Sequence, residues 1–401
     1  MRVLVPMTSS SFSNRGNISS FLAMDVMCEA NILQQTGQDI CHLEVGQPST
    51  KAPQVVLEAA RQALDSELIG YTDALGLDDL KQALSAYYLK TYKVDVSPDR
   101  FVITTGSSAG FILAFLACLD AGQQVAITSP GYPAYTNIIK SLDLTPVTIP
   151  LCHENNWTLS ATNVHDAEKA HGGIDALLMA SPANPTGTML SKQALTDLSL
   201  DCAKAGRWFF SDEIYHGLTY SQEAISALQV ADHDRLIVMN SFSKYFSMTG
   251  WRIGWMIVPS KLVRPVERLQ QNLFISAPTL SQYAACAALT SAAQDELKRH
   301  VELYQDNRDK LFACLQDNGV TNIAPADGAF YLYADLHSLS PSLESGTFCA
   351  QLLKEAKVAA TPGMDFDKDR GARYVRFSYA RSSDEIDRAV NRLNEFLARF
   401  H

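Results

Sequence analysis

Short apolar or β-branched segments alternate with helix-length segments through the middle of this 401-residue chain, and this alternation constrains its fold more than any other feature. The segments lie at residues 101–105, 124–128, 146–149, 176–180, 208–211, 236–240 and 255–258. Because a stretch long enough for a helix separates most of them, they predict a mostly parallel, seven-stranded sheet covered by helices on both faces. We therefore expect a large α/β domain.

The two ends of the chain differ from this middle region. Residues 1–20 are rich in Ser and Asn and predict an arm, and residues 21–36 predict a helix. After about residue 285, strand-like pieces at 329–333, 357–361 and 374–377 are mixed with helices, and the last helix begins with Ser382-Ser383-Asp384-Glu385, the pattern of a capping box.

The length of the chain exceeds what one hydrophobic core usually supports, so we expect two domains. We predict an N-terminal arm and helix over 1–50 that pack with the small domain, a large ligand-binding domain over 51–284, and a small C-terminal α+β domain over 285–401.

Composition argues against several classes of function. The chain has 33 Lys and Arg against 43 Asp and Glu, a formal net charge of -10, which disfavours nucleic-acid binding. No apolar run reaches membrane-spanning length, and the apolar start Met1–Met7 is too short for a signal peptide. The eight cysteines form no C-x-x-C pair and no zinc spacing, so we expect reduced thiols, no metal site and a cytoplasmic protein.

The stretch from Ser241 to Arg252 gives the strongest chemical indication. Lys244 lies among hydroxyls, eight residues before Arg252, and a lysine is costly to bury as a free cation. Its amine makes sense if it forms a Schiff base with a carbonyl, and the arginine makes sense as the ligand of a phosphate. Pyridoxal phosphate (PLP) carries both an aldehyde and a phosphate, and we predict it as the cofactor.

Five polar clusters each follow the end of a predicted strand, at 106–108, 129–132, 181–184, 211–212 and 241–244. Ligands of open α/β sheets bind at the carboxyl ends of the strands. The five clusters therefore predict a single site.

Each cluster taken alone also has a simpler interpretation. Ser107 and Ser108 at a helix N-terminus could bind an anion or could merely cap the helix. Tyr132 offers a face for stacking but could be a core aromatic residue. Asn184, in Asn184-Pro185-Thr186-Gly187, could donate to a phenolate oxygen or could belong to an ordinary turn.

Two charged residues at strand positions have similar alternatives. Asp212 could pair with a protonated ring nitrogen, with the Tyr215 hydroxyl reaching the same ring, or it could be a helix N-cap. Arg376, between apolar neighbours, could bind a substrate carboxylate or form an internal salt bridge.

Together these stretches resemble the class I/II aminotransferases of PLP fold type I, the aspartate/aromatic type. The resemblance runs from Leu43–Pro48 to Arg376 and the last helix. Each motif is weak alone, but their order is specific: Asn-Pro-Thr-Gly, Asp-Glu-x-Tyr, Ser-x-x-Lys and Gly-x-Arg-x-Gly.

The resemblance implies a role for each residue. Lys244 would form the Schiff base and move the substrate proton, Asp212 would pair with the ring nitrogen, and Tyr132 would stack on the ring. The phenolate oxygen would be bound by Tyr215 and Asn184, and the phosphate by Ser107, Ser108, Ser241 and Arg252. The substrate carboxylate would be bound by Arg376, Asn184 and the backbone of Gly46. Tyr71 would reach the phosphate of the neighbouring subunit, which implies a homodimer.

The implied activity is the transfer of an amino group from an L-amino acid to a 2-oxo acid. We expect a neutral donor, apolar or aromatic, because the segment 18–21 is uncharged and a second substrate cation has no better candidate than Arg15. A carbon–sulfur β-lyase of the same fold needs the same residues and is the alternative. A regulator fused to a DNA-binding domain would need a basic segment upstream, which this acidic chain does not show.

Overall fold

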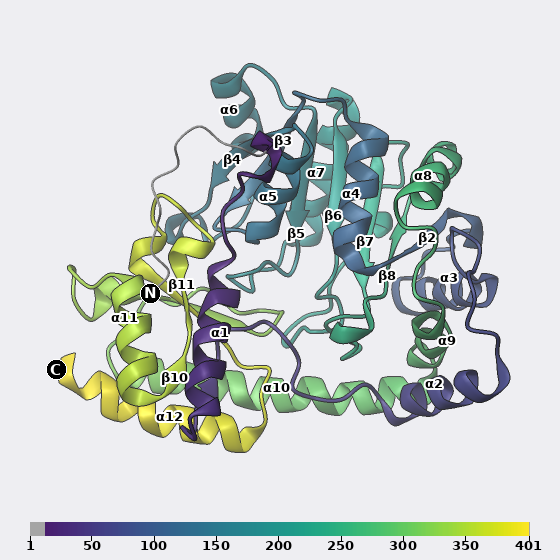
Figure 1. Cartoon of the computed structure of the whole chain (residues 1–401). Coiled ribbons are helices and arrows are strands. Elements are labelled where there is room, and N and C mark those ends of the chain that lie inside the picture. Colours follow the sequence, from purple (N-terminus) through teal and green to yellow (C-terminus); the bar gives the residue numbers. More distant parts are fainter. Residues whose placement is uncertain (1–12, 401) are drawn as a thin grey trace.

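The computed structural model describes residues 13–400; the remainder of the predicted arm, with the segment Met1–Met7, lies outside the described residues. Its centre is a seven-stranded sheet in the order β2-β8-β7-β6-β5-β3-β4 (Figure 1). Only β8 is antiparallel to its neighbours. The strands are β2 Phe101–Thr104, β3 Gln124–Ser129, β4 Thr145–Pro150, β5 Ala176–Ala180, β6 Trp208–Asp212, β7 Leu236–Ser241 and β8 Gly254–Ile257. The predicted mostly parallel sheet is confirmed.

The two faces of this sheet belong to two separate apolar clusters. Successive strand residues point to opposite faces, so Phe209 and Val238 pack in one cluster while Phe210 and Ile237 pack in the other. One face is covered by α4 Gly106–Cys118, α5 Pro133–Ser141 and α8 Ser260–Leu273. The other is covered by α3 Asp78–Tyr92, α6 Ala161–His171 and α7 Lys192–Ala205.

Two further sheets lie beside the large one. β9 Tyr331–Asp335, β12 Tyr374–Ser378 and β11 Thr361–Pro362 form an antiparallel sheet, with β12 in the middle. β1 Cys41–His42 pairs in parallel with β10 Val358–Ala359, so the N-terminal segment packs with the C-terminal part. The helices of this region are α1 Leu22–Gln35, α11 Ser345–Gln351 and α12 Ser383–Leu397.

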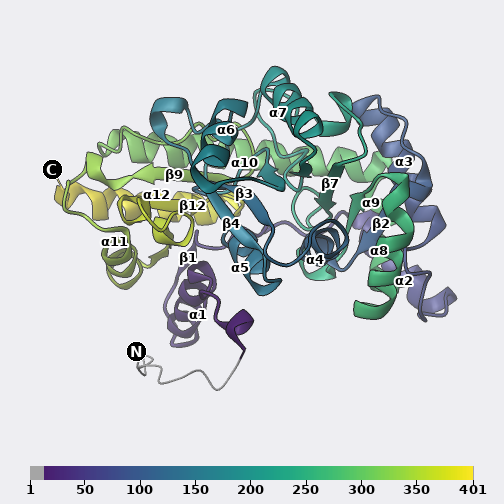
Figure 2. The same cartoon turned by 90° about the horizontal axis from the view of Figure 1, so that it is seen from above.

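A long helix connects the two regions. Helix α10, Ser291–Asp317, runs along the bottom of the molecule beneath both (Figure 1), and the view from above shows it reaching from one region to the other (Figure 2). It follows α9 Thr279–Ala288, which packs against α2 Gln54–Ser66. All strands of the large sheet fall within 51–284 and all others fall outside that range. The domain boundaries themselves stay a prediction.

Two local predictions need correction. The predicted strand at 357–361 is two short strands, because β10 pairs with β1 whereas β11 pairs with β12. The predicted capping box at the start of α12 is only half formed. The Ser382 hydroxyl accepts from the Glu385 N–H at 3.3 Å, but the Glu385 carboxylate accepts from the His42 N–H at 2.7 Å instead of closing the box.

Within the part of the chain that the structure describes, no helix combines the length and apolar character needed to cross a membrane. The same residues contain no cluster of three or more His, Cys, Asp or Glu side chains that could hold a metal ion.

Candidate active site

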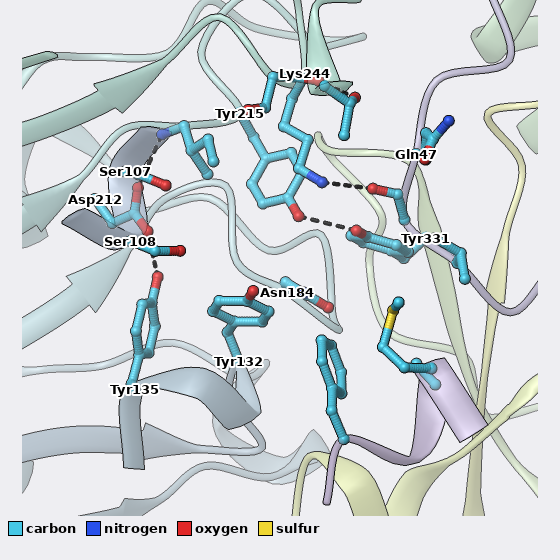
Figure 3. A pocket seen from close by; sticks show the side chains of 18 of the residues that line it. Gln47, Ser107, Ser108, Tyr132, Tyr135, Asn184, Asp212, Tyr215, Lys244 and Tyr331 are labelled. Atoms are coloured by element: carbon cyan, nitrogen blue, oxygen red, sulfur yellow. Dashed lines mark hydrogen bonds between the residues drawn. The ribbon is translucent and has the colours of Figure 1, made fainter. Parts of the chain in front are cut away.

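A cavity of about 450 Å³ lies where the carboxyl ends of the sheet strands meet α1 and the smaller sheet. Figure 3 shows Lys244 and Tyr215 projecting into it from above, Ser107, Ser108 and Asp212 on one side, and Tyr331 on the other. Ten of the predicted residues line it: Gly46, Ser107, Ser108, Tyr132, Asn184, Asp212, Tyr215, Lys244, Arg252 and Arg376. Segments far apart in the sequence thus form a single site.

Lys244 lies on the loop that follows β7, and its Nζ donates to the Gly46 carbonyl at 2.5 Å. Burial, together with the positive charges of Arg376 and Arg252, lowers the pKa of this amine to about 8, while Asp212 opposes the shift. Near neutral pH, Lys244 is therefore a neutral amine far more often than an ordinary lysine, and this is the form that attacks carbonyls and accepts protons.

Asp212, the last residue of β6, is buried and faces the cavity. It accepts hydrogen bonds from the Tyr135 hydroxyl and, at 3.0 Å, from the Ile214 N–H. Burial raises its pKa to about 6, against the effect of these two donors. A turn rather than a helix follows, so Asp212 is not a helix N-cap. Sequence reasoning gave Tyr135 no role, because its contact is with a residue 77 positions away.

Arg376 on β12 has only neutral oxygen partners. Its Nη1 donates to the Asn184 side-chain oxygen at 2.9 Å, and its Nη2 donates to the Glu44 carbonyl at 2.6 Å. The buried Nε has no partner, and the guanidinium lies between the Tyr331 and Phe366 rings. No described acidic side chain pairs with it, which rules out the internal salt bridge. A buried cation in this state calls for an anionic ligand.

The N-terminus of α4 forms an anion site at the other end of the cavity. No side chain caps this helix, and Gly106 has a positive φ of 73° with the Arg252 guanidinium packed against it. Ser107 and Ser108 follow in the first turn. Free N–H groups, two hydroxyls and a guanidinium suit a phosphate.

Two predicted phosphate ligands do not line this cavity. The Ser241 hydroxyl is buried against Ser243 Oγ at 2.9 Å and the Ile253 carbonyl at 3.0 Å, and Ser243 lines the cavity in its place. A contact between Ser241 and phosphate stays a prediction that the geometry does not favour. The Tyr71 side chain is 86% exposed and lies outside its own cavity.

Tyr331 is a further residue that the sequence did not reveal. Its hydroxyl lies 2.9 Å from the Tyr215 hydroxyl, 116 positions away in sequence. It also fills the space that a Cβ at position 46 would occupy, so only glycine fits there. Tyr331 therefore contacts three parts of the site. It packs against Gly46, whose carbonyl accepts the hydrogen bond from Lys244; its hydroxyl meets that of Tyr215; and its ring lies against the Arg376 guanidinium.

The remaining wall of the cavity is apolar. It is formed mainly by Phe21, Ala23, Met24, Met27, Val45 and Ile214. Phe21 packs edge-on against Tyr132 at 5.8 Å between ring centroids. Of the predicted neutral segment 18–21, only Phe21 reaches this wall. Arg15 is not a second substrate cation, because it pairs with Asp143 at 2.7 Å on the surface, outside the cavity.

These groups fit PLP. Lys244 would supply the amine for the aldehyde, Asp212 a buried carboxylate for a protonated ring nitrogen, and the N-terminus of α4 with Arg252 the phosphate site. Tyr132 and Tyr215 offer the ring and hydroxyl contacts, and Arg376 stays free for a second anion.

Comparison with known proteins agrees with this geometry. The family model described as aminotransferase class I and II matches residues 38–393. A valine–pyruvate aminotransferase of Mycobacterium tuberculosis is 41% identical over 96% of this chain and 97% of its own length. The crystal structure of an aminotransferase from the same organism has a TM-score of 0.93 at 40% identity, covering 98% of this chain and 100% of that one. The aspartate aminotransferase of Thermus thermophilus has a TM-score of 0.89 at 28% identity, covering 96% and 99%.

Proposed function

Because this chain belongs to the class I and II aminotransferase family and is a PLP-dependent aminotransferase, we propose that it moves the amino group of a neutral L-amino acid, apolar or aromatic, to a 2-oxo acid. The cations around the cavity are the main support for a neutral donor. Among its described lining residues these are Lys244, Arg252 and Arg376.

Each of the three cations already has a task. Lys244 holds the cofactor aldehyde, Arg252 the phosphate, and Arg376 the α-carboxylate of the substrate. No further cation of the described lining is left for a second carboxylate, and the wall presents Phe21, Met24 and Met27 instead. An acidic side chain would be buried there without a partner, which is costly. An apolar side chain would gain from burial.

The protein's own groups orient and deprotonate the donor. Arg376, with Asn184 holding its Nη1, fixes the α-carboxylate. Lys244 Nζ holds and moves the proton at the donor Cα, with a pKa near 8 that suits both acceptance and return. When bound, PLP takes up the amino group and withdraws electrons from Cα. Asp212 keeps the ring nitrogen protonated for this purpose, and Tyr132 keeps water from the ring.

A panel of amino donors tests the choice of substrate. We expect kcat/KM for valine, leucine and phenylalanine to exceed that for aspartate and glutamate by at least about 100-fold, equivalent to ~2.7 kcal/mol, with pyruvate or 2-oxoglutarate as acceptor. Valine with pyruvate is the first pair to test, given the relative named above. Equal or better activity with aspartate would overturn the proposal.

Adding a cysteine-type donor to the panel, without an acceptor, tests the carbon–sulfur β-lyase alternative. That reaction forms pyruvate and ammonia from a cysteine-type donor without a 2-oxo acid acceptor. The lyase would use the same residues, and the described cavity residues offer nothing that favours elimination. We expect no product when the acceptor is left out.

We further propose a homodimer whose partner completes the phosphate site. The loop that carries Tyr71 is joined to the start of α9 by a hydrogen bond from Thr279 to the Gly70 carbonyl. Leu68, Tyr71, Leu273 and Ile275 are 91%, 86%, 50% and 51% exposed, an apolar surface suited to burial against a second copy. A second copy would bring Tyr71 towards the neighbouring phosphate site.

We also propose that the protein resides in the cytoplasm. All eight cysteines are free, with no disulfide between them. Reduced thiols in a chain of this size are usual in a reducing compartment.

A further inference from the structure

The N-terminus of α1 is capped by a side chain from the opposite end of the sequence. Asp365 accepts from the Leu22 N–H at 3.0 Å through Oδ1 and from the Ala23 N–H at 3.2 Å through Oδ2. The residue that occupies the N-cap position, Phe21, has no side chain that could do this. The next two N–H groups of the helix, at Met24 and Asp25, both bond the Phe21 carbonyl. Asp365 therefore satisfies the two first-turn donors that the helix leaves free.

Helix α1 buries few of its own side chains, although it also packs against β10 and β11. Only Ala23 and Ala30 on this helix are buried. Its one apolar cluster is small, consisting of Ala30, Ile40, Leu353 and Ala359, with Val26 and Leu33 at its edge. A carboxylate at the N-terminus of a helix also interacts favourably with the helix dipole. The cap is thus a large part of what places the first turn of α1.

The first two turns of α1 carry much of the apolar wall of the substrate cavity. Phe21, Met24 and Met27 line the cavity from this helix and the residue before it. In Figure 3, α1 is the purple ribbon across the cavity from Ser107, Ser108 and Asp212. A small tilt of α1 would move these three side chains together while leaving Lys244 and Asp212 in place.

The loop that bears Asp365 also touches the carboxylate site. Phe366 packs against the Arg376 guanidinium with 4.5 Å to its ring centroid, and its carbonyl accepts from the Gly131 N–H at 3.0 Å. The loop is closely packed, because a Cβ at Gly363 would meet the Gly371 and Tyr374 carbonyls at 2.5 Å. The wall is therefore held in a fixed relation to the group that binds the α-carboxylate.

We infer that Asp365 is a positioning residue that sets the selectivity for the donor side chain, by fixing the α1 wall relative to Arg376. The inference rests on the proposed apolar donor. Asp365 touches neither substrate nor cofactor in this scheme. It acts through Phe21, Met24 and Met27.

The test compares a large donor with a small one. In Asp365→Ala holoenzyme we expect kcat/KM for phenylalanine to fall about tenfold, mainly through KM, while that for alanine changes less than twofold, because the alanine side chain does not reach the wall. Asp365→Asn keeps one acceptor oxygen, so its kcat/KM for phenylalanine should lie between those of the wild type and Asp365→Ala. Lys368→Ala is the matched control: it removes a bond from the same loop to Ser19, 3.1 Å long, without touching the cap.

Hydrogen exchange gives a second readout. We expect faster exchange of the amides at the start of α1, residues 22–25, in Asp365→Ala and not in Lys368→Ala. If exchange is unchanged, or if phenylalanine and alanine lose activity by the same factor, the inference is wrong. The proposed function is tested by the order of kcat/KM values among donors in the wild type alone. The role of Asp365 is tested separately, by the ratio of kcat/KM in the variant to that in the wild type for each donor.

Discussion

Lys244 and Asp212 face the same cavity, and burial moves their pKa values toward each other, to about 8 and about 6. Each group is thereby close to changing its charge near neutral pH. Perturbations of this kind are frequent at functional sites. They fit the two tasks of moving a proton and holding a ring nitrogen protonated.

Replacement of Lys244 should separate cofactor binding from chemistry. Lys244→Ala keeps the proposed phosphate site at α4 and Arg252, so we expect it to retain PLP through gel filtration, measured by absorbance. Turnover should fall at least about a thousandfold, since the group that moves the proton is gone. Lys51→Ala, an exposed lysine outside this cavity, is the control. Normal transamination by Lys244→Ala would refute the assignment.

Asp212 should matter through its charge. Asp212→Asn keeps the volume and one acceptor for Tyr135 or Ile214 but loses the anion, and Asp212→Ala loses both. We expect normal folding by circular dichroism and a loss in kcat of roughly 100- to 1,000-fold in both variants, ~2.7–4 kcal/mol of barrier. Near-wild-type turnover of the Asn variant would show that the charge is not needed.

The neighbouring Glu213 is buried in a network that the reaction does not use. Its Oε1 accepts from Ser226 Oγ at 3.0 Å and from the Ala227 N–H at 2.8 Å. His216, whose Nδ1 lies 3.5 Å from Glu213 Oε2, is kept uncharged because burial lowers its pKa to about 3. With no cation beside it, Glu213 has a pKa that burial raises to about 8.

This shift predicts a pH dependence of stability. Between pH 4.5 and about 8 the unfolded chain ionises Glu213 while the folded protein keeps it protonated, so rising pH favours unfolding; above pH 8 the effect is constant. Glu213→Gln stays neutral in both states. We expect its thermal midpoint, relative to wild type, to increase from pH 5 to pH 8 and then level off. A constant difference across this range would show that Glu213 is ionised in the folded protein.

At the scale of elements, the N-terminus of α4 is where the backbone itself forms part of the site. Gly106 has φ 73°, a conformation that favours glycine, and it lies against the Arg252 guanidinium. Any side chain at 106 would push that guanidinium away from the first turn of α4.

We therefore expect Gly106→Ala to weaken PLP binding about tenfold or more, measured by fluorescence titration of the apoenzyme. Gly122→Ala is the matched control, since Gly122 has a similar φ of 88° but open space around its Cα. Both variants should lose some stability from backbone strain. If both bind PLP equally well, Arg252 is not held in place by Gly106.

At the scale of the whole molecule, the exposed Tyr71 would link cofactor affinity to assembly in the proposed homodimer. We expect Tyr71→Phe to weaken PLP binding several-fold while kcat at saturating PLP stays within about threefold. Dilution of the wild type should lower PLP affinity as the dimer dissociates. Tyr283→Phe is the control, a half-buried tyrosine whose hydroxyl lies 3.4 Å from Glu67. A monomer with full activity would contradict the dimer.

Residue patterns alone were enough to predict the large sheet and to bring most of the predicted site residues to one cavity. Alternation of apolar residues is a local property, and it places Phe209 and Phe210 on opposite faces whatever lies above them. The polar residues that follow strands, such as Asp212 and Lys244, meet at one edge because parallel strands share a direction.

The hydrogen-bond partners of the site residues, in contrast, could be known from packing alone. Tyr135 binds Asp212 across 77 positions, Tyr331 meets Tyr215 across 116, and Asp365 caps α1 across 343. The choice between a salt bridge and an unpaired cation at Arg376 was also settled there. Such contacts depend on how the elements pack, because the sequence around a donor or acceptor does not identify a partner far away in the chain. The periodicity of the chain fixes which face a residue takes, whereas packing fixes what it touches.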